Sequence, residues 1–250
     1  MDKLAKAAAA FGVSLNDEQL GRFRRYYELL EDGSKTANLT GAHGWERVRE
    51  ELFIRSLRLL APAPGGHLSS AQWLNERKVI DVGAGAGIPG LVLKLALPGM
   101  SLVLLDSNHK KTAFLRSAVA ELGLDDVKVL TGRAEEVAWQ ANHRERYEVA
   151  VSRGVARLCE LAELVLPFVI PGGTAIIPKG QGAELEIREG QFAIETMGGL
   201  PPIAQEVTSP GAAPGDTIVY ILKVRPTPYD YPRRTGLPHQ RPLLRTNEPG

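Results

Sequence analysis

The chain has 250 residues, 44% hydrophobic and 24% charged, with a formal net charge of +1. This composition indicates a globular protein rather than a disordered chain, and the charge lacks the strongly basic balance typical of nucleic-acid-binding domains. The single cysteine, Cys159, excludes an internal disulfide and a cysteine-based metal cluster, and the five histidines are scattered. No apolar stretch reaches the roughly 18 residues of a membrane span. We therefore expect a cytoplasmic protein that holds no metal and does not enter a membrane.

The first sixty residues carry apolar side chains at helical spacing, which predicts a mostly helical start to the chain. One stripe consists of Leu20, Phe23, Tyr27 and Leu30, and a second of Val48, Leu52 and Leu59. Residues 62–70 are rich in proline, glycine and serine, which predicts a linker. We therefore expect an N-terminal helical subdomain with its linker over residues 1–75.

From Lys78 onward, short apolar runs alternate with helical segments, which predicts an α/β domain over residues 76–225. The expected strands are Val79–Val82, Leu102–Leu105, Val127–Leu130, Tyr147–Val151 and Thr174–Ile177, followed by a closing strand at Ile218–Val224. Because these strands are almost continuously apolar, we expect a mostly parallel sheet with helices on both faces. The tail, residues 226–250, is rich in proline and arginine, and we expect it to be either extended over the surface or loosely ordered.

A glycine-rich loop at the end of the first expected strand is the strongest local motif. It reads Asp81-Val-Gly-Ala-Gly-Ala-Gly-Ile-Pro-Gly90. Glycines at positions 83, 85 and 87 remove the side chains that would keep a ligand away from the backbone. The helix after Ile88 offers N-terminal amide groups to a phosphate, a carboxylate or a nucleoside hydroxyl. The loop therefore predicts a nucleotide or nucleoside site.

An acid, Asp106, ends the second expected strand, where it can accept hydrogen bonds from both ribose hydroxyls of a nucleoside. This placement suits S-adenosylmethionine and NAD equally, and its structural alternative is a cap for the next helix. The Gly85-x-Gly87-x-x-Gly90 spacing also satisfies the dinucleotide fingerprint, so an NAD(P)-dependent oxidoreductase is a rival interpretation. Asp81, before the first glycine, favours a methyltransferase.

Several blocks together resemble the small-subunit ribosomal RNA methyltransferase G family, also called glucose-inhibited division protein B, in their order and spacing. They are the glycine loop, Leu105-Asp-Ser-Asn-His-Lys-Lys-Thr-Ala-Phe-Leu-Arg116, Gly132-Arg-Ala-Glu-Glu136, Val151-Ser-Arg-Gly154 and Pro178-Lys-Gly-Gln181. The chain departs from the family where a His-x-x-Asp-Ser-Leu pattern is common, because Leu52 and Arg55 stand in place of the histidine and the aspartate. The resemblance implies a class I, Rossmann-like methyltransferase that uses S-adenosylmethionine to methylate N7 of a guanine in 16S rRNA of the small ribosomal subunit, and we expect a monomer.

The resemblance also implies a set of cofactor residues. Gly83 and Ile88 would line the cofactor together with Asp81 and Gly85, Asp106 with Ser107 and Asn108 would hold its ribose, Ala134 and Glu135 would contact the adenine, and Arg153 would close the site. Each has a structural alternative: Ile88 could face the core, Glu135 could be a first-turn acid, and Arg153 could be a surface ion-pair partner.

The expected chemistry needs no general base, because guanine N7 attacks with a free lone pair and loses no proton. The chain lacks the Asn/Asp-Pro-Pro-Tyr/Phe motif of exocyclic-amine methylation, and Cys159 lies on an apolar helix, which disfavours methylation at a pyrimidine carbon. We expect Arg153 to position the substrate. Candidates for RNA contact are Lys179, Lys110, Lys111, Arg233 and Arg234, with solvated surfaces as the alternative. A small-molecule methyltransferase and a silent nucleoside-binding module remain further alternatives.

Overall fold

The computed structural model describes residues 1–62, 71–209 and 212–245. They form two compact units, Met1–Gly132 with Thr208–Ala212, and Arg133–Val207 with Ala213–Gly250. Most of the predicted linker lies outside the described residues. The division into residues 1–75, 76–225 and 226–250 stays a prediction from sequence.

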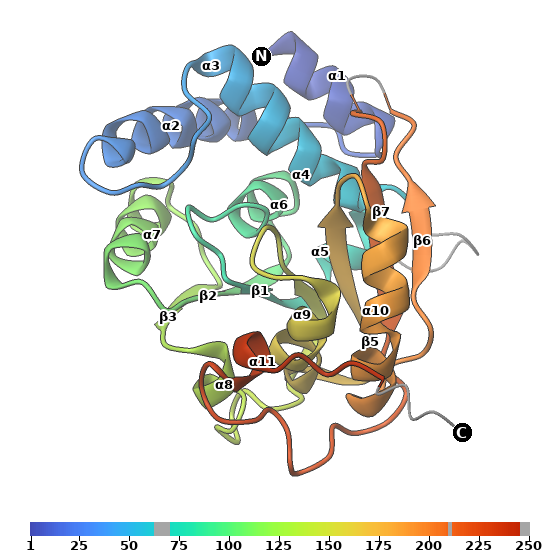
Figure 1. The fold of residues 1–250 in the computed structure, drawn as a ribbon. Coiled ribbons are helices and arrows are strands. Elements are labelled where there is room, and N and C mark those ends of the chain that lie inside the picture. The colour runs from blue at the N-terminus through green and yellow to red at the C-terminus, as the bar shows by residue number, and fades with distance from the viewer. Residues whose placement is uncertain (63–70, 210–211, 246–250) are drawn as a thin grey trace. The chain divides into compact units, whose positions relative to one another are not determined.

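Unit 1 combines the N-terminal helices with three parallel strands, in the order β3-β2-β1 (Figure 1). Three of the predicted strands are thereby confirmed. The elements of this unit are α1 (Asp2–Ala10), α2 (Asp17–Ser34), α3 (Trp45–Arg47), the π-helix η1 (Val48–Ile54), α4 (Arg55–Leu57), the 3-10 helix η2 (Arg58–Leu60), α5 (Ala71–Asn75), β1 (Lys78–Val82), α6 (Gly90–Ala96), β2 (Ser101–Asp106), α7 (His109–Glu121) and β3 (Val127–Thr131).

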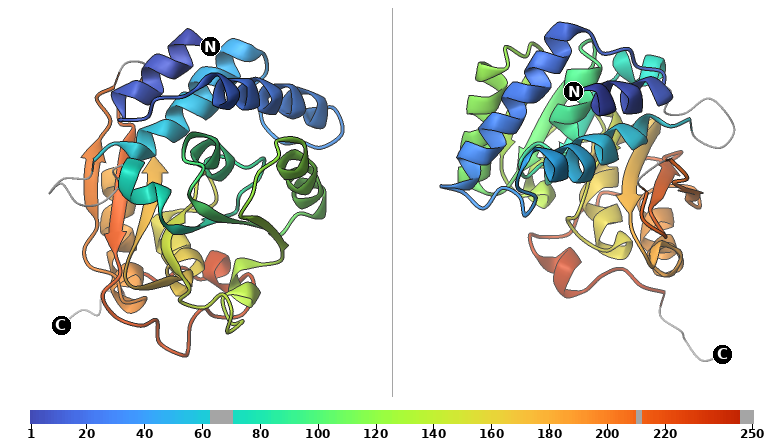
Figure 2. Two further views of the ribbon diagram at one scale, coloured as in Figure 1. Left: turned by 180° about the vertical axis from the view of Figure 1, so that it is seen from behind. Right: turned by 90° about the horizontal axis from the view of Figure 1, so that it is seen from above.

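Helix α2 begins with a reciprocal cap and packs against α6 and α7 (Figure 2). The side chain of Asn16 accepts the Gln19 N–H, and the Gln19 side chain accepts the Asn16 N–H, which satisfies two free donors of the first turn. The predicted apolar stripe is wrong by one position. Tyr26 is fully buried, whereas Tyr27 is half-buried against Trp45.

A feature of unit 1 that was not predicted is the π-helix η1, which begins at Val48, the first residue of the second apolar stripe. Leu52, at the position of the family histidine, is buried within it. The Ser56 hydroxyl donates to the Leu52 carbonyl at 2.6 Å, while Arg55 opens the short helix that follows. Leu52 therefore serves the apolar packing of this segment.

Unit 2 contains four strands in the order β4-β5-β7-β6. Strands β4 and β5 are parallel, and β7 is antiparallel to both β5 and β6. The predicted closing strand is confirmed as β7, whereas the exposed β6 was not predicted. The elements of this unit are α8 (Ala134–Val137), β4 (Tyr147–Val151), α9 (Leu158–Val165), η3 (Leu166–Phe168), β5 (Val169–Lys179), α10 (Ala183–Thr196), β6 (Ile203–Glu206), β7 (Thr217–Leu222) and α11 (Leu237–Gln240).

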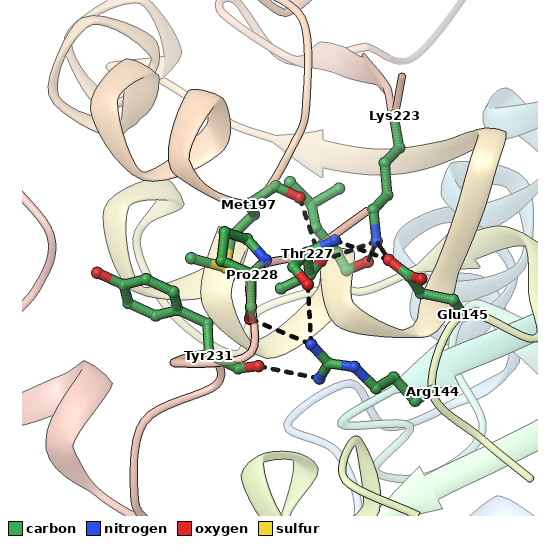
Figure 3. A network of polar contacts seen from close by, with 8 residues as sticks. Arg144, Glu145, Met197, Lys223, Thr227, Pro228 and Tyr231 are labelled. Atoms are coloured by element: carbon green, nitrogen blue, oxygen red, sulfur yellow. Dashed lines mark hydrogen bonds and ion pairs between the residues drawn. The ribbon is translucent and has the colours of Figure 1, made fainter. Parts of the chain in front are cut away.

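The C-terminal arm, residues 225–245, lies along unit 2 and includes α11, which packs against α9 (Figure 1). Of the two alternatives for the tail, the extended one is the one observed, although α11 interrupts it. The base of the arm rests on a buried polar network (Figure 3). There the Lys223 ammonium, fully buried, donates to Glu145 Oε1 at 2.7 Å and to Thr227 Oγ1 and the Leu166 carbonyl at 2.8 Å.

This network predicts a stability that depends on pH. Burial lowers the pKa of Lys223 from 10.5 to about 8, although the Glu145 carboxylate opposes the shift. At pH values between these two pKa values, Lys223 holds a proton in the unfolded chain that it has released in the folded chain. The free energy of unfolding therefore rises with pH in this range, by at most about 1.4 kcal/mol per pH unit. Urea unfolding from pH 8 to 9.5 should show this rise, and Lys223→Met should remove it. Equal slopes for the two proteins would contradict the assignment.

Candidate functional site

The first site residue, Asp81, serves the start of α6. It is fully buried at the end of β1, and its Oδ2 accepts the Gly90 N–H at 2.8 Å. A carboxylate at a helix N-terminus compensates the free amide groups there. A side chain at Gly90 would place its Cβ 2.7 Å from the same oxygen. The described contacts of Asp81 therefore fix the helix that follows the glycine loop.

The glycines of the loop have different roles. Gly83, Gly85 and Gly87 have φ angles of 76°, 59° and 92°, which favour glycine. A Cβ on Gly87 would also collide with Leu91 at 2.6 Å, so this position is closed by packing. A Cβ on Gly85 would meet only the Gly83 carbonyl oxygen, at 3.9 Å. Gly85 is thus a glycine whose Cα a ligand can approach.

Asp106 connects the tip of β2 to this loop. Its Oδ2 accepts the Gly85 N–H and its Oδ1 accepts the Asn108 N–H, both at 2.8 Å. Each carboxylate oxygen has two lone pairs, so both can accept one further donor. The capping alternative for Asp106 is wrong, because the side chain of Asn108 caps α7 by accepting the Lys110 and Lys111 N–H groups. Asp106 is therefore held in place with acceptor capacity for a diol.

Tyr26, on helix α2, supports the glycine loop. This residue was not singled out from the sequence. Its hydroxyl donates to the Ala86 carbonyl at 2.6 Å, and its ring stacks on Phe53. Burial and the nearby Asp81 hold the pKa of this phenol well above its ordinary value, so it remains a donor. The predicted apolar stripe of α2 contained Tyr27 in its place, so the sequence pattern did not mark Tyr26.

We expect Tyr26→Phe to lower the free energy of unfolding by about 1–2 kcal/mol, because the Ala86 carbonyl loses its buried donor. We also expect weaker binding at the loop. Chemical unfolding and calorimetric titration with S-adenosylhomocysteine measure the two effects. Tyr27→Phe, on the same helix, is the matched control, and equal effects of both substitutions would contradict the role of Tyr26.

The remaining predicted cofactor residues belong to unit 2. Ala134 and Glu135 open α8, and the Glu135 carboxylate accepts from Arg133 at 3.2 Å and from the Gly236 N–H at 2.9 Å. Burial by itself raises the pKa of Glu135, but these bonds and its own backbone N–H lower it overall. Arg153 follows the end of β4 and is half-buried. Glu135 is therefore a buried, hydrogen-bonded carboxylate.

The candidates for RNA contact differ in how free their charges are. Lys179 forms an ion pair with Glu186 at 2.7 Å and donates to the Ala156 carbonyl, and Arg233 is paired with the buried Glu163 at 2.7 Å. Lys110 and Arg234 are exposed, and Lys111 is half-buried. Asp81, Gly83, Gly85, Ile88, Asp106, Ser107 and Asn108 belong to unit 1, whereas Ala134, Glu135, Arg153 and Lys179 belong to unit 2. Hydrogen bonds join Gly85, Asp106 and Asn108 to one another.

Two further findings concern metal ions and membranes. Within residues 1–62, 71–209 and 212–245, no three His, Cys, Asp or Glu side chains are grouped so that they could hold a metal ion. In the same residues, no helix combines the length and the apolar character needed to cross a membrane.

Parallel strands that alternate with helices, an antiparallel last strand, and a glycine loop joined to an acid on the next strand define the class I, Rossmann-like methyltransferase fold. Residues 19–208 match the family described as rRNA small subunit methyltransferase G. Relatives with the name "Ribosomal RNA small subunit methyltransferase G" include one from Dehalococcoides mccartyi (strain CBDB1), 37% identical over 98% of this chain and 100% of the relative. Another, from Moorella thermoacetica, is 40% identical over 96% and 97%. The chain belongs to this family.

Proposed function

We propose that the chain transfers a methyl group from S-adenosylmethionine to N7 of a guanine in 16S rRNA of the small ribosomal subunit. The observation that carries the proposal is the Asp106 carboxylate, fixed by the Gly85 and Asn108 N–H groups beside an approachable glycine. This arrangement suits a ribose, and the membership of the chain in a methyltransferase family supports S-adenosylmethionine over NAD.

Bound S-adenosylmethionine would supply a methyl group on an activated sulfonium, so the protein mainly has to align donor and acceptor. Asp106 would bind the ribose hydroxyls, and the loop from Gly83 to Ile88 would give the cofactor close access to the backbone. Ala134 and Glu135 would bind the adenine. Because guanine N7 gives up no proton, no side chain has to act as a base, and Arg153 would position the guanine.

The class of ligand can be tested on the purified chain. We expect S-adenosylhomocysteine to raise the melting temperature, whereas NAD(H) and NADP(H) should leave it unchanged. Nucleoside mass spectrometry of small-subunit RNA, with and without the gene, then tests the product. Stabilisation by a nicotinamide nucleotide alone would reject the cofactor, and unchanged 7-methylguanosine on deletion would reject the substrate.

A positioning role for Arg153 predicts a specific kinetic result. Arg153→Ala should lower kcat at least tenfold and change the affinity for S-adenosylhomocysteine by less than about threefold, because misalignment affects transfer more than binding. The control is Arg157→Ala, whose guanidinium pairs with Glu189 on the protein surface. Loss of cofactor affinity with unchanged kcat would contradict this role.

A further inference from the structure

The C-terminal arm runs antiparallel along one continuous segment of unit 2, residues 133–146. As the arm proceeds, its contacts move backward through that segment. At the start of the arm, the Thr227 N–H donates to Glu145 at 2.7 Å, and Arg144 donates to the Tyr231 carbonyl at 2.9 Å. Next, the Trp139 indole donates to the Pro232 carbonyl at 3.0 Å. Last, Thr235 donates to Glu136 at 2.8 Å, and the Gly236 N–H donates to Glu135 at 2.9 Å. Such an ordered series joins the two segments along their length.

The arm is also anchored outside this series. Arg233 binds Glu163 on α9 through its guanidinium, at 2.7 to 3.1 Å, and through its backbone N–H at 2.6 Å. Glu163 is fully buried, so this is a charge pair that cannot dissociate into solvent without a large cost. Farther along, His239 lies 2.9 Å from Glu160 on the same helix. The arm therefore contacts α9 on either side of Gly236, through Arg233 and through His239.

The far end of the series reaches the residue proposed to bind adenine. Gly236 has a φ of 79°, and this left-handed turn directs its N–H at Glu135 Oε1. The Glu135 side chain is 3% exposed, so its orientation depends on its few partners, which here are Arg133 and the arm.

We propose that the C-terminal arm is a brace for residues 133–146 and that Gly236 is a positioning residue, which sets the affinity for the adenosyl cofactor by orienting Glu135. This inference rests on the proposed function, because it takes Glu135 as part of the adenine site. Binding free energies are reciprocal, so a cofactor that uses the braced Glu135 must also hold the arm more tightly.

Two shortened chains test the brace. A chain ending at Arg234 keeps the anchor to Glu163 and the Lys223 network, but it lacks the Thr235 and Gly236 contacts together with helix α11 and the His239–Glu160 contact. A chain ending at Arg241 keeps all of these contacts and is the matched control. Calorimetric titration with S-adenosylhomocysteine should show at least about tenfold weaker binding for the first and less than about twofold change for the second. The melting temperature of each chain, measured alongside, reports its folding.

Hydrogen exchange on the full-length chain provides the second measurement, which needs no altered protein. Saturating S-adenosylhomocysteine should slow exchange of the Gly236 amide at least about fivefold, whereas the Leu200 amide, bonded to the Leu222 carbonyl, should not change. Equal affinities for the two shortened chains, or an unchanged Gly236 amide when the ligand is bound, would overturn the brace and leave the proposed function standing. Failure of the full-length chain to bind S-adenosylhomocysteine would reject the proposed function and the brace with it.

Discussion

Asp106→Asn should weaken binding of S-adenosylhomocysteine about a hundredfold, since a hydrogen bond to a charged group contributes roughly 1.5–3 kcal/mol and the substitution removes both the charge and one acceptor. The geometry makes the change more severe than its size suggests. Both carboxylate oxygens accept backbone N–H groups, from Gly85 and from Asn108. An asparagine in either orientation places its NH2 group against one of these donors. Either the Gly85 N–H or the Asn108 N–H therefore loses its acceptor, in addition to the weaker binding of the ligand.

Calorimetric titration measures the affinity, and urea unfolding should show a loss of about 1–2 kcal/mol from the unpaired N–H. Asp125→Asn, an exposed acid in the same unit, is the control for the change in charge. If Asp106→Asn lowered the stability but bound S-adenosylhomocysteine as tightly as the control, Asp106 would be a structural residue and the ribose would have to bind elsewhere.

Much of the fold was predictable from sequence because the strands β1, β2 and β4 are almost entirely buried and largely apolar. Such strands appear as short continuous hydrophobic runs, and β1, β2 and β4 were located in this way to within one residue. The strand β6 gives no such signal, since three of its four residues are exposed. The π-helix η1 also has no distinct pattern, because its apolar residues fit an ordinary helical stripe equally well.

Residues of the candidate site could be predicted only where a chemically distinctive residue stands next to a recognisable element in the chain. The glycine loop and Asp106 could be found because each directly follows an apolar strand. Tyr26 was missed because the predicted apolar stripe contained its neighbour Tyr27 instead, and because its hydrogen bond to Ala86 joins residues 60 positions apart. Arg233 was interpreted as a candidate RNA contact because it lies in a basic tail, but its partner, Glu163, is 70 positions away. Pairings of this kind depend on tertiary structure.

Arg233→Met should be the most destabilising single substitution considered, with a loss of about 3–5 kcal/mol in the free energy of unfolding, because it leaves the fully buried Glu163 carboxylate without its cation. Glu163→Gln combined with Arg233→Met should recover at least half of that loss. Glutamine carries no charge, and its Oε1 can still accept the N–H of residue 233, which donates to Glu163 at 2.6 Å in the native chain.

Urea unfolding at neutral pH measures all three free energies, and the comparison of single and double variants isolates the cost of the buried charge. Arg234→Met is the control, because this neighbouring side chain faces solvent and should change the stability by less than about 0.5 kcal/mol. If Arg233→Met and Arg234→Met were equally mild, Glu163 would have to be accommodated by water or a proton. The arm would then be held by its backbone contacts and not by this charge pair.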